Sequence, residues 1–111
     1  MAMMSFNAPG EREKSLWLVR KESNPNHSQW YIDRFKAMEA EGNDMAGESR
    51  LVNALASRGA KILDAGSGPG RVGKQLHALG HRVTGVDIDP ELIEEARRVC
   101  PDATWITADL V

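Results

Sequence analysis

Short apolar runs alternate with segments of helical period in the second half of the chain. Three runs are short and nearly all apolar, which predicts strands at residues 60–65, 81–87 and 104–108. Two intervening segments repeat apolar residues at helical spacing, which predicts helices at about 70–79 and 90–99. Strand, helix, strand, helix, strand with short links predicts parallel strands joined by right-handed crossovers.

Turn chemistry supports these boundaries. Gly80 stands where a helix C-terminal glycine is expected, and Asp89 with Pro90 provides an N-cap and a first helical residue. Pro101 enforces the end of that second helix. The fold class predicted is α/β, a Rossmann-like doubly wound parallel sheet, present here as an incomplete β-α-β-α-β half. Such apolar strands are typical of sheets covered by helices on both faces.

The first half of the chain follows a different pattern. Residues 1–27 are expected to be a flexible tail, with at most a helical turn or two across 12–20. Residues 28–59 are expected to be a helical lead-in to the domain at 60–111. In its first helix, Ser28 is the predicted N-cap and Tyr31, Phe35 and Met38 share one face.

A second lead-in helix is predicted near residues 45–57. Asp44 can cap it, and Gly59 closes it. Leu51, Val52 and Leu55 are expected on its buried side. The aromatic stripe of the preceding helix, which includes Trp30, is expected to be core rather than a cover over a ligand.

Composition excludes several classes of protein. The 111 residues carry a net charge of −2, so a nucleic-acid partner held by bulk charge is not expected. A single cysteine, Cys100, excludes an internal disulfide and a multi-cysteine zinc site, and favours a cytoplasmic location. Scattered histidines predict no metal site, and no apolar stretch has the length of a membrane span.

The candidate chemistry lies in KILDAGSGPG, residues 61–70. An apolar run ends in Asp64, and glycines follow at alternate positions, Gly66, Gly68 and Gly70. Seventeen residues later a second apolar run ends in Asp87. Glycines let backbone approach a ligand closely, and an acid at the next strand's tip can accept hydrogen bonds from ribose hydroxyls. This pairing predicts a nucleotide-like cofactor.

An alternative is a nicotinamide or flavin oxidoreductase, because Gly68, Gly70 and Gly73 satisfy G-x-G-x-x-G. This alternative would extend the first strand to about Ser67. It would also set Asp64 near a pyrophosphate, where a carboxylate is unfavourable. An acid at this place suits a ligand with a positive amine instead.

ILDAGSGPG together with VTGVDIDPELIEEAR resembles motifs one and two of class I S-adenosylmethionine-dependent methyltransferases. WITADLV, residues 105–111, resembles their third-strand segment. The resemblance covers about residues 46–111 and implies S-adenosyl-L-methionine as cofactor. Residues 28–51 are similar, more weakly, to the helical lead-in of small bacterial members.

The resemblance also implies site residues. Asp64 matches the acid near the methionine amino group, and Asp87 matches the acid that holds both ribose hydroxyls. Gly66, Ser67, Gly68 and Gly70 match the loop under the methionine and ribose. Around the adenine, Ile88 packs on the face, Asp109 accepts from the amino group, and the Leu110 N–H reaches the ring. Arg71 could meet the cofactor carboxylate, although a solvated arginine is the favoured interpretation.

No catalytic residue is predicted, because in this family acceptor contacts come after a fourth strand and from the lead-in. The acceptor is unknown, and a small molecule is expected rather than a macromolecule. The first strand should be central in a complete sheet, so the chain is interpreted as a fragment, inactive alone. Its exposed strand edge makes a homo-oligomer possible.

Overall fold

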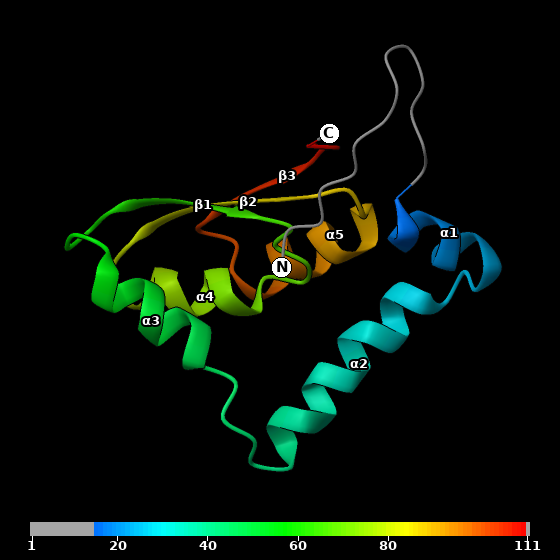
Figure 1. Ribbon diagram of the computed structural model, residues 1–111, viewed down its shortest axis with the longest axis horizontal. Coiled ribbons are helices and arrows are strands. Elements are labelled where there is room, and N and C mark those ends of the chain that lie inside the picture. Colours follow the sequence, from blue (N-terminus) through cyan, green and yellow to red (C-terminus); the bar gives the residue numbers. More distant parts are fainter. Residues whose placement is uncertain (1–14, 111) are drawn as a thin grey trace.

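The computed structural model describes residues 15–110. The helices are α1 (Leu16–Ser23), α2 (His27–Ala40), α3 (Gly47–Leu55), α4 (Arg71–Ala78) and α5 (Pro90–Val99). The strands are β1 (Lys61–Ala65), β2 (Arg82–Asp87) and β3 (Thr104–Thr107). In Figure 1 the strands form one layer, with α3, α4, α5 and α2 beneath it.

The sheet is parallel, in the order β1-β2-β3. Ile62 pairs with Val83, and Val86 pairs with Ile106. The predicted β-α-β-α-β half is therefore confirmed, with each boundary within two residues of its expected place. Parallel alignment brings the carboxyl ends of all three strands to one edge of the sheet.

Within the described residues, the crossover helices cover one face of the sheet, as expected for half of a doubly wound fold. Both crossovers run in the same direction across the sheet, so their right-handedness places α4 and α5 on one face (Figure 1). On the covered side Val83 and Trp105 are buried. On the opposite side Leu63 remains 64% exposed and Ile106 43% exposed.

The core lies between α5 and the sheet and is centred on Trp105. Its indole packs with Ile93, Ala96 and Cys100, and its Nε1 donates to the Cys100 carbonyl oxygen at 2.7 Å. Gly85 on β2 makes room for this ring, because a Cβ there would lie 2.3 Å from it. A small residue at Gly85 therefore allows the one large aromatic of the sheet to fill the core.

The lead-in differs from its prediction at its start. Helix α1 lies inside the range expected to be tail, with Ser15 as its N-cap. Helix α2 begins at His27 with Asn26 as its N-cap, so Ser28 is not the cap. Ser28 is fully buried instead and donates a hydrogen bond to Asp89. Residues 1–14 of the predicted tail lie outside the described residues.

Helix α3 also departs from expectation. It begins at Gly47 after Ala46, and Asp44 accepts from the Ala46 N–H without being the cap. Leu51 and Leu55, expected to be buried, are 62% and 80% exposed. The face of α3 that packs on α4 carries Ser49, which donates to Gln75 at 2.8 Å. A polar contact thus replaces the predicted apolar one.

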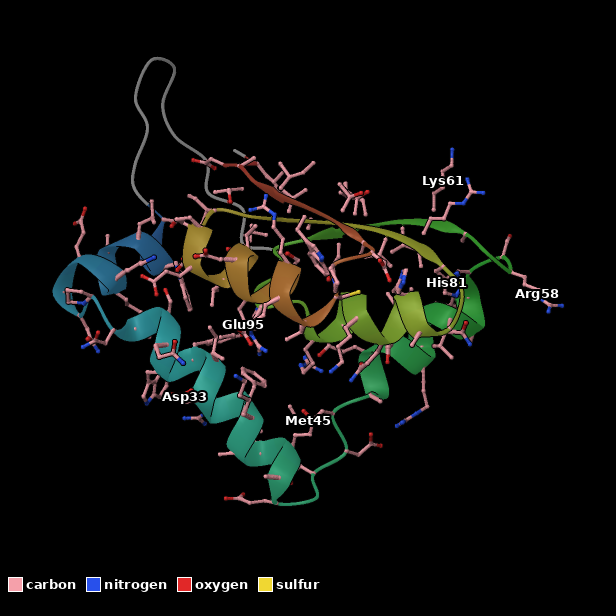
Figure 2. The ribbon with its side chains drawn as sticks, turned by 180° about the vertical axis from the view of Figure 1, so that it is seen from behind. Asp33, Met45, Arg58, Lys61, His81 and Glu95 are labelled. Carbon is pink, nitrogen blue, oxygen red and sulfur yellow. The ribbon has the colours of Figure 1, made fainter. Side chains whose placement is uncertain are left out.

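His81 ties α3 to the amino ends of the strands. Its Nδ1 accepts from the Ala60 N–H at 3.1 Å, which leaves Nε2 to donate to the Asn53 side chain at 2.8 Å. Figure 2 shows His81 with Arg58 and Lys61 at this end of the molecule, away from the carboxyl ends of the strands.

Candidate cofactor site

The loop after β1 is folded by its glycines. Gly66, Gly68 and Gly70 have φ of 73°, 57° and 87°, in the left-handed region that side chains avoid. The N–H groups of Gly66 and Ser67 both donate to the Val86 carbonyl oxygen, at 2.8 and 3.0 Å. The loop therefore turns back over the end of β2 before α4 begins.

Asp87, the last residue of β2, is brought directly to this loop. Its Oδ2 accepts a hydrogen bond from the Gly68 N–H at 2.9 Å. Its Oδ1 accepts from the Asp89 N–H, also at 2.9 Å. Each carboxylate oxygen has capacity for a further donor. The arrangement can hold two ligand hydroxyls beside a backbone bend.

Asp64 has a buried oxygen with no partner. It lies near the end of β1, and its Oδ2 makes no hydrogen bond within the described residues. The buried Oγ of Ser67 also makes none. Burial raises the pKa of Asp64, as do the nearby Glu48 and Asp87 carboxylates, while Arg71 opposes the shift. A buried acceptor without a donor is rare in folded proteins. A ligand ammonium group would supply the missing hydrogen bond.

Helix α2 covers the glycine loop through Tyr31. A Cβ at Gly68 would lie 3.9 Å from the Tyr31 ring, so the ring faces the loop in ordinary contact distance. Tyr31 also packs against Phe35, with ring centroids 4.7 Å apart. Burial raises the pKa of Tyr31, and Asp87 adds to that shift while Arg71 opposes it. The stripe predicted to be core includes a residue that lies over the candidate site.

Arg71 is held by contacts with three neighbouring segments of the protein. Its guanidinium donates to the Met45 carbonyl oxygen at 2.6 Å and to Glu48 at 3.0 Å. It also lies over the Phe35 ring, 5.3 Å from the centroid. The favoured interpretation, a solvated arginine, is therefore wrong, whereas a contact with the cofactor carboxylate stays a prediction. Its role is to join α4 to α2 and to the segment before α3.

Gly70 is held by packing as well as by its φ. A Cβ at Gly70 would meet the Ala96 Cβ at 2.9 Å and the Trp105 ring at 3.1 Å. The hydrogen that replaces a side chain thus faces α5. Close approach of α4 to α5 is enough to account for a glycine at this position.

The predicted adenine residues lie at the same edge of the sheet. Ile88 is half-buried directly after Asp87. The Ala108 N–H donates to the Asp87 carbonyl oxygen at 2.9 Å, which leads the chain past Asp87 toward Asp109 and Leu110. Both of these residues are exposed. The structure therefore gathers every predicted site residue at the carboxyl ends of the strands.

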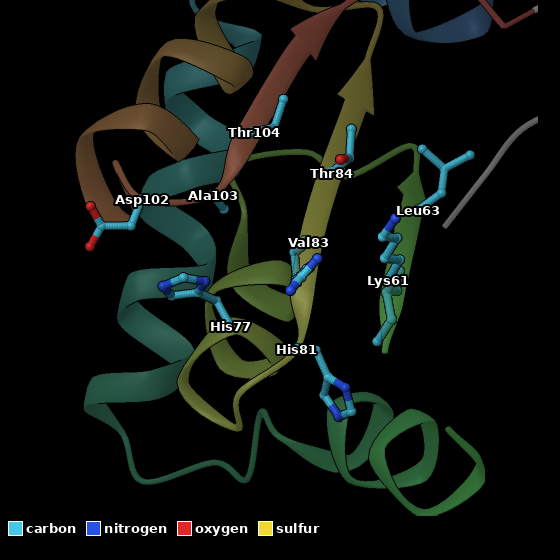
Figure 3. A pocket seen from close by; sticks show the side chains of 11 residues that line it. Lys61, Leu63, His77, His81, Val83, Thr84, Asp102, Ala103 and Thr104 are labelled. Carbon is cyan, nitrogen blue, oxygen red and sulfur yellow. The ribbon is translucent and has the colours of Figure 1, made fainter. Parts of the chain in front are cut away.

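A shallow cavity of about 580 Å³ lies elsewhere, at the amino ends of the strands (Figure 3). Its lining includes Lys61, His77, His81, Asp102 and Thr104, and none of the glycine loop. Ligands of open parallel sheets bind outside the carboxyl ends of the strands. The carboxyl edge, with its unpartnered acid, remains the candidate site.

Sequence reasoning missed Asp89 as more than a helix cap. Its carboxylate is fully buried and also accepts hydrogen bonds from Trp17 and Ser28. No local signal in the sequence points to these partners, because they lie 61 and 72 positions from Asp89. Within residues 15–110, no three side chains of His, Cys, Asp or Glu are grouped as metal ligands would be, and no helix could cross a membrane.

The site has the features of a class of protein: α/β domains whose glycine bend and strand-end acids are suited to a nucleoside-bearing cofactor. Strand β1 ends at Ala65, so the glycine bend starts at Gly66 rather than at Gly68. That start contradicts the extended first strand that the oxidoreductase alternative requires. The alternative has no support from the comparisons with known proteins either.

Those comparisons agree with one another. The family model described as a methyltransferase domain matches residues 62–111. A ubiquinone biosynthesis O-methyltransferase of Xanthomonas campestris is 30% identical over 89 residues, which cover 69% of this chain and 37% of the relative. A TehB-like SAM-dependent methyltransferase from Corynebacterium glutamicum superposes with a TM-score of 0.76 at 52% identity, covering 78% of this chain and 47% of that one.

The family model, the curated relatives and the solved structure all support a class I S-adenosylmethionine-dependent methyltransferase, of which the chain carries the N-terminal part of the fold. It spans less than half the length of both relatives just described. S-adenosyl-L-methionine is the cofactor of this family. The unpartnered Asp64 oxygen and the glycine bend fit its methionine amino group, which is a cation.

Proposed function

We propose that the protein carrying this chain is a methyltransferase and that the carboxyl edge of β1, β2 and β3 binds its S-adenosyl-L-methionine. The observation that carries this proposal is the buried Asp64 Oδ2, which has no donor beside a bare-backbone bend. A buried carboxylate in this position is costly unless a cation meets it. The methionine ammonium is the cation that the family's cofactor provides.

The other residues divide the remaining contacts. Asp87 receives the two ribose hydroxyls, with its orientation set by the N–H groups of Gly68 and Asp89. The loop from Gly66 to Gly70 passes beneath the methionine and ribose, with Ser67 contributing a hydroxyl that has no other partner. Ile88 packs on the adenine, while Asp109 and the Leu110 N–H reach its polar edge.

The chemistry requires little of the protein beyond geometry. The bound cofactor supplies a methyl carbon that its sulfonium already activates. The chain's part is to hold that group in line with an acceptor, and such orientation can contribute about 7–11 kcal/mol to the barrier. No residue of this chain is assigned as a catalytic base.

We infer a small-molecule acceptor and a cytoplasmic location. The Xanthomonas relative is named for an O-methylation in ubiquinone biosynthesis, which supports a small acceptor. The single buried, unpaired cysteine, Cys100, supports a reducing compartment.

Titration of S-adenosylhomocysteine into the full-length protein tests this proposal. Saturable binding by calorimetry is expected, with no saturable binding of NADH. Asp64→Ala should weaken the binding of S-adenosylhomocysteine at least tenfold, as loss of a charged hydrogen bond does. Saturable binding of NADH with no heat from S-adenosylhomocysteine would reject the assignment.

A further inference from the structure

Asp89 receives more hydrogen bonds than a helix cap needs. Its carboxylate accepts from the N–H groups of Glu91 and Leu92, which is the N-cap of α5. It accepts three further bonds from side chains, namely Trp17 Nε1, Ser28 Oγ and Lys21 Nζ. Asp89 itself is fully buried. Five donors on one carboxylate indicate a junction, a point where several segments of the chain are held together.

The side-chain donors come from a different part of the fold. Trp17 and Lys21 lie on α1, and Ser28 lies in the first turn of α2. They are separated from Asp89 by 61 to 72 positions in the chain. One carboxylate therefore fastens both lead-in helices to the start of α5. A hydrogen-bonded pair with Lys21 at 2.8 Å compensates its buried charge.

The same residue also reaches the candidate cofactor site through its backbone. The Asp89 N–H donates to Asp87 Oδ1, and Asp87 Oδ2 accepts from the Gly68 N–H. Hydrogen bonds thus run from α1 and α2 through Asp89 and Asp87 to the glycine loop. Asp89 does not need to touch the cofactor to influence how Asp87 is aimed.

Tyr31 lies on the other side of this junction. It stands three residues after Ser28, one turn along α2, and its ring faces Gly68. Trp17 packs edge-on against the Tyr31 ring, with centroids 5.2 Å apart. Trp17 and Ser28, two of the three residues whose side chains donate to Asp89, therefore locate Tyr31 over the loop.

We propose that Asp89 is a positioning residue of the cofactor site: it locks the lead-in helices so that Tyr31 covers the glycine loop, and it aims Asp87 at the ribose. This inference rests on the proposed function. Under this proposal, α1 and α2 contribute to cofactor binding because the buried carboxylate of Asp89 holds them in place.

Asp89→Asn separates this role from the helix cap. Asparagine is an equally good N-cap, so α5 keeps its start. The new amide N–H₂ group, however, faces the donors of Trp17 and Ser28 and offers no charge to Lys21. Asp44→Asn is the matched control, since exposed Asp44 also accepts a backbone N–H ahead of a helix and pairs with Arg50.

The measurement is the Kd of S-adenosylhomocysteine for the full-length protein, with the melting temperature recorded beside it. Asp89→Asn should raise this Kd roughly tenfold, while Asp44→Asn should stay within about twofold of wild type. Saturable binding to the wild type is the requirement of the proposed function, and the inference falls with it. If the wild type binds and Asp89→Asn binds equally well, the inference alone is overturned.

A double-mutant cycle distinguishes positioning from general stability. In a Tyr31→Ala background, Asp89→Asn should cost much less affinity than in wild type, because the group it positions is gone. If the fold-losses in affinity of the two single variants simply multiply in the double variant, the inference is overturned.

If Asp89→Asn does not fold, Trp17→Phe and Ser28→Ala leave the cap intact. Each should raise the Kd by roughly threefold, and unchanged affinity in both would also overturn it.

Discussion

Asp87 accepts a hydrogen bond from the backbone N–H of Gly68 at 2.9 Å, which joins the tip of β2 to the loop that follows β1. The acid and the bend are separated by 19 positions in the chain. This contact joins the acid and the glycine bend into one site, whereas the sequence shows them only as two separate motifs. Loss of the carboxylate should affect both the ligand and the loop.

Asp87→Ala should therefore weaken S-adenosylhomocysteine binding by roughly tenfold to a hundredfold, the effect of losing charge-assisted hydrogen bonds. Calorimetry on the full-length protein measures it. Asp102→Ala is the control, because Asp102 is an exposed acid at the amino ends of the strands. Equal affinities for both variants would contradict the assignment of Asp87.

Asp64 should make cofactor binding sensitive to pH. Burial raises its pKa above the ordinary aspartate value in the free protein, and an ammonium ligand binds the ionised form. As the pH falls through this raised pKa, the carboxylate takes up a proton and affinity should fall. Titrations from neutral pH downward follow this loss, which should begin at a higher pH than for an ordinary aspartate with a pKa near 3.9.

Asp64→Asn supplies the control for that profile. The variant should bind S-adenosylhomocysteine weakly at every pH, without the decline that Asp64 causes. It should also unfold no more readily than wild type, since the unpartnered buried charge is removed. An Asp64→Asn profile that declines as the wild type does would show that another group titrates.

Acid stability should depend on Asp89. Burial by itself would raise the pKa of Asp89, but the hydrogen bonds from Lys21, Ser28 and Trp17 outweigh it and hold the pKa below its usual value. The stabilisation is therefore complete above the unfolded value near 3.9 and is lost as the pH falls through the lower folded pKa. Urea unfolding of wild type and Asp89→Asn from about pH 6 to about pH 3 should show their difference shrinking only at the acidic end. A constant difference would contradict it.

Gly85→Ala should destabilise the fold. The added Cβ would lie 2.3 Å from the Trp105 ring and 3.0 Å from the Ser67 Cβ, so the core must shift. A cost of roughly 1–3 kcal/mol in the free energy of unfolding is expected. Gly47→Ala is the matched change, since nothing lies within 4 Å of its Cβ position. It should be neutral or slightly stabilising, and similar urea midpoints for the two variants would refute the packing argument.

The sequence predicted the second half of the fold well because its signals are local. Strand, glycine bend, helix and cap follow one another within a few residues, as at Ala65, Gly66 and Asp89. The acids at the strand ends came to one edge of the sheet because parallel strands align their carboxyl ends. These features follow from the backbone alone.

The lead-in could not be predicted in the same way. Ser28 resembles a helix cap, and only its burial against Asp89, 61 residues later, shows another role. Arg71 resembles a surface charge until Met45 and Phe35 are folded onto it. Leu51 and Leu55 have core-like spacing, yet α3 turns them outward. Contacts between distant segments decide each of these cases.

A crystal structure of the full-length protein with S-adenosylhomocysteine would test the central claim most directly. The account predicts the ligand's amino nitrogen within hydrogen-bond distance of Asp64 Oδ2 and both ribose hydroxyls on Asp87, beneath Tyr31. A ligand bound at the amino ends of the strands, or an Asp64 side chain turned away from the ligand, would contradict it.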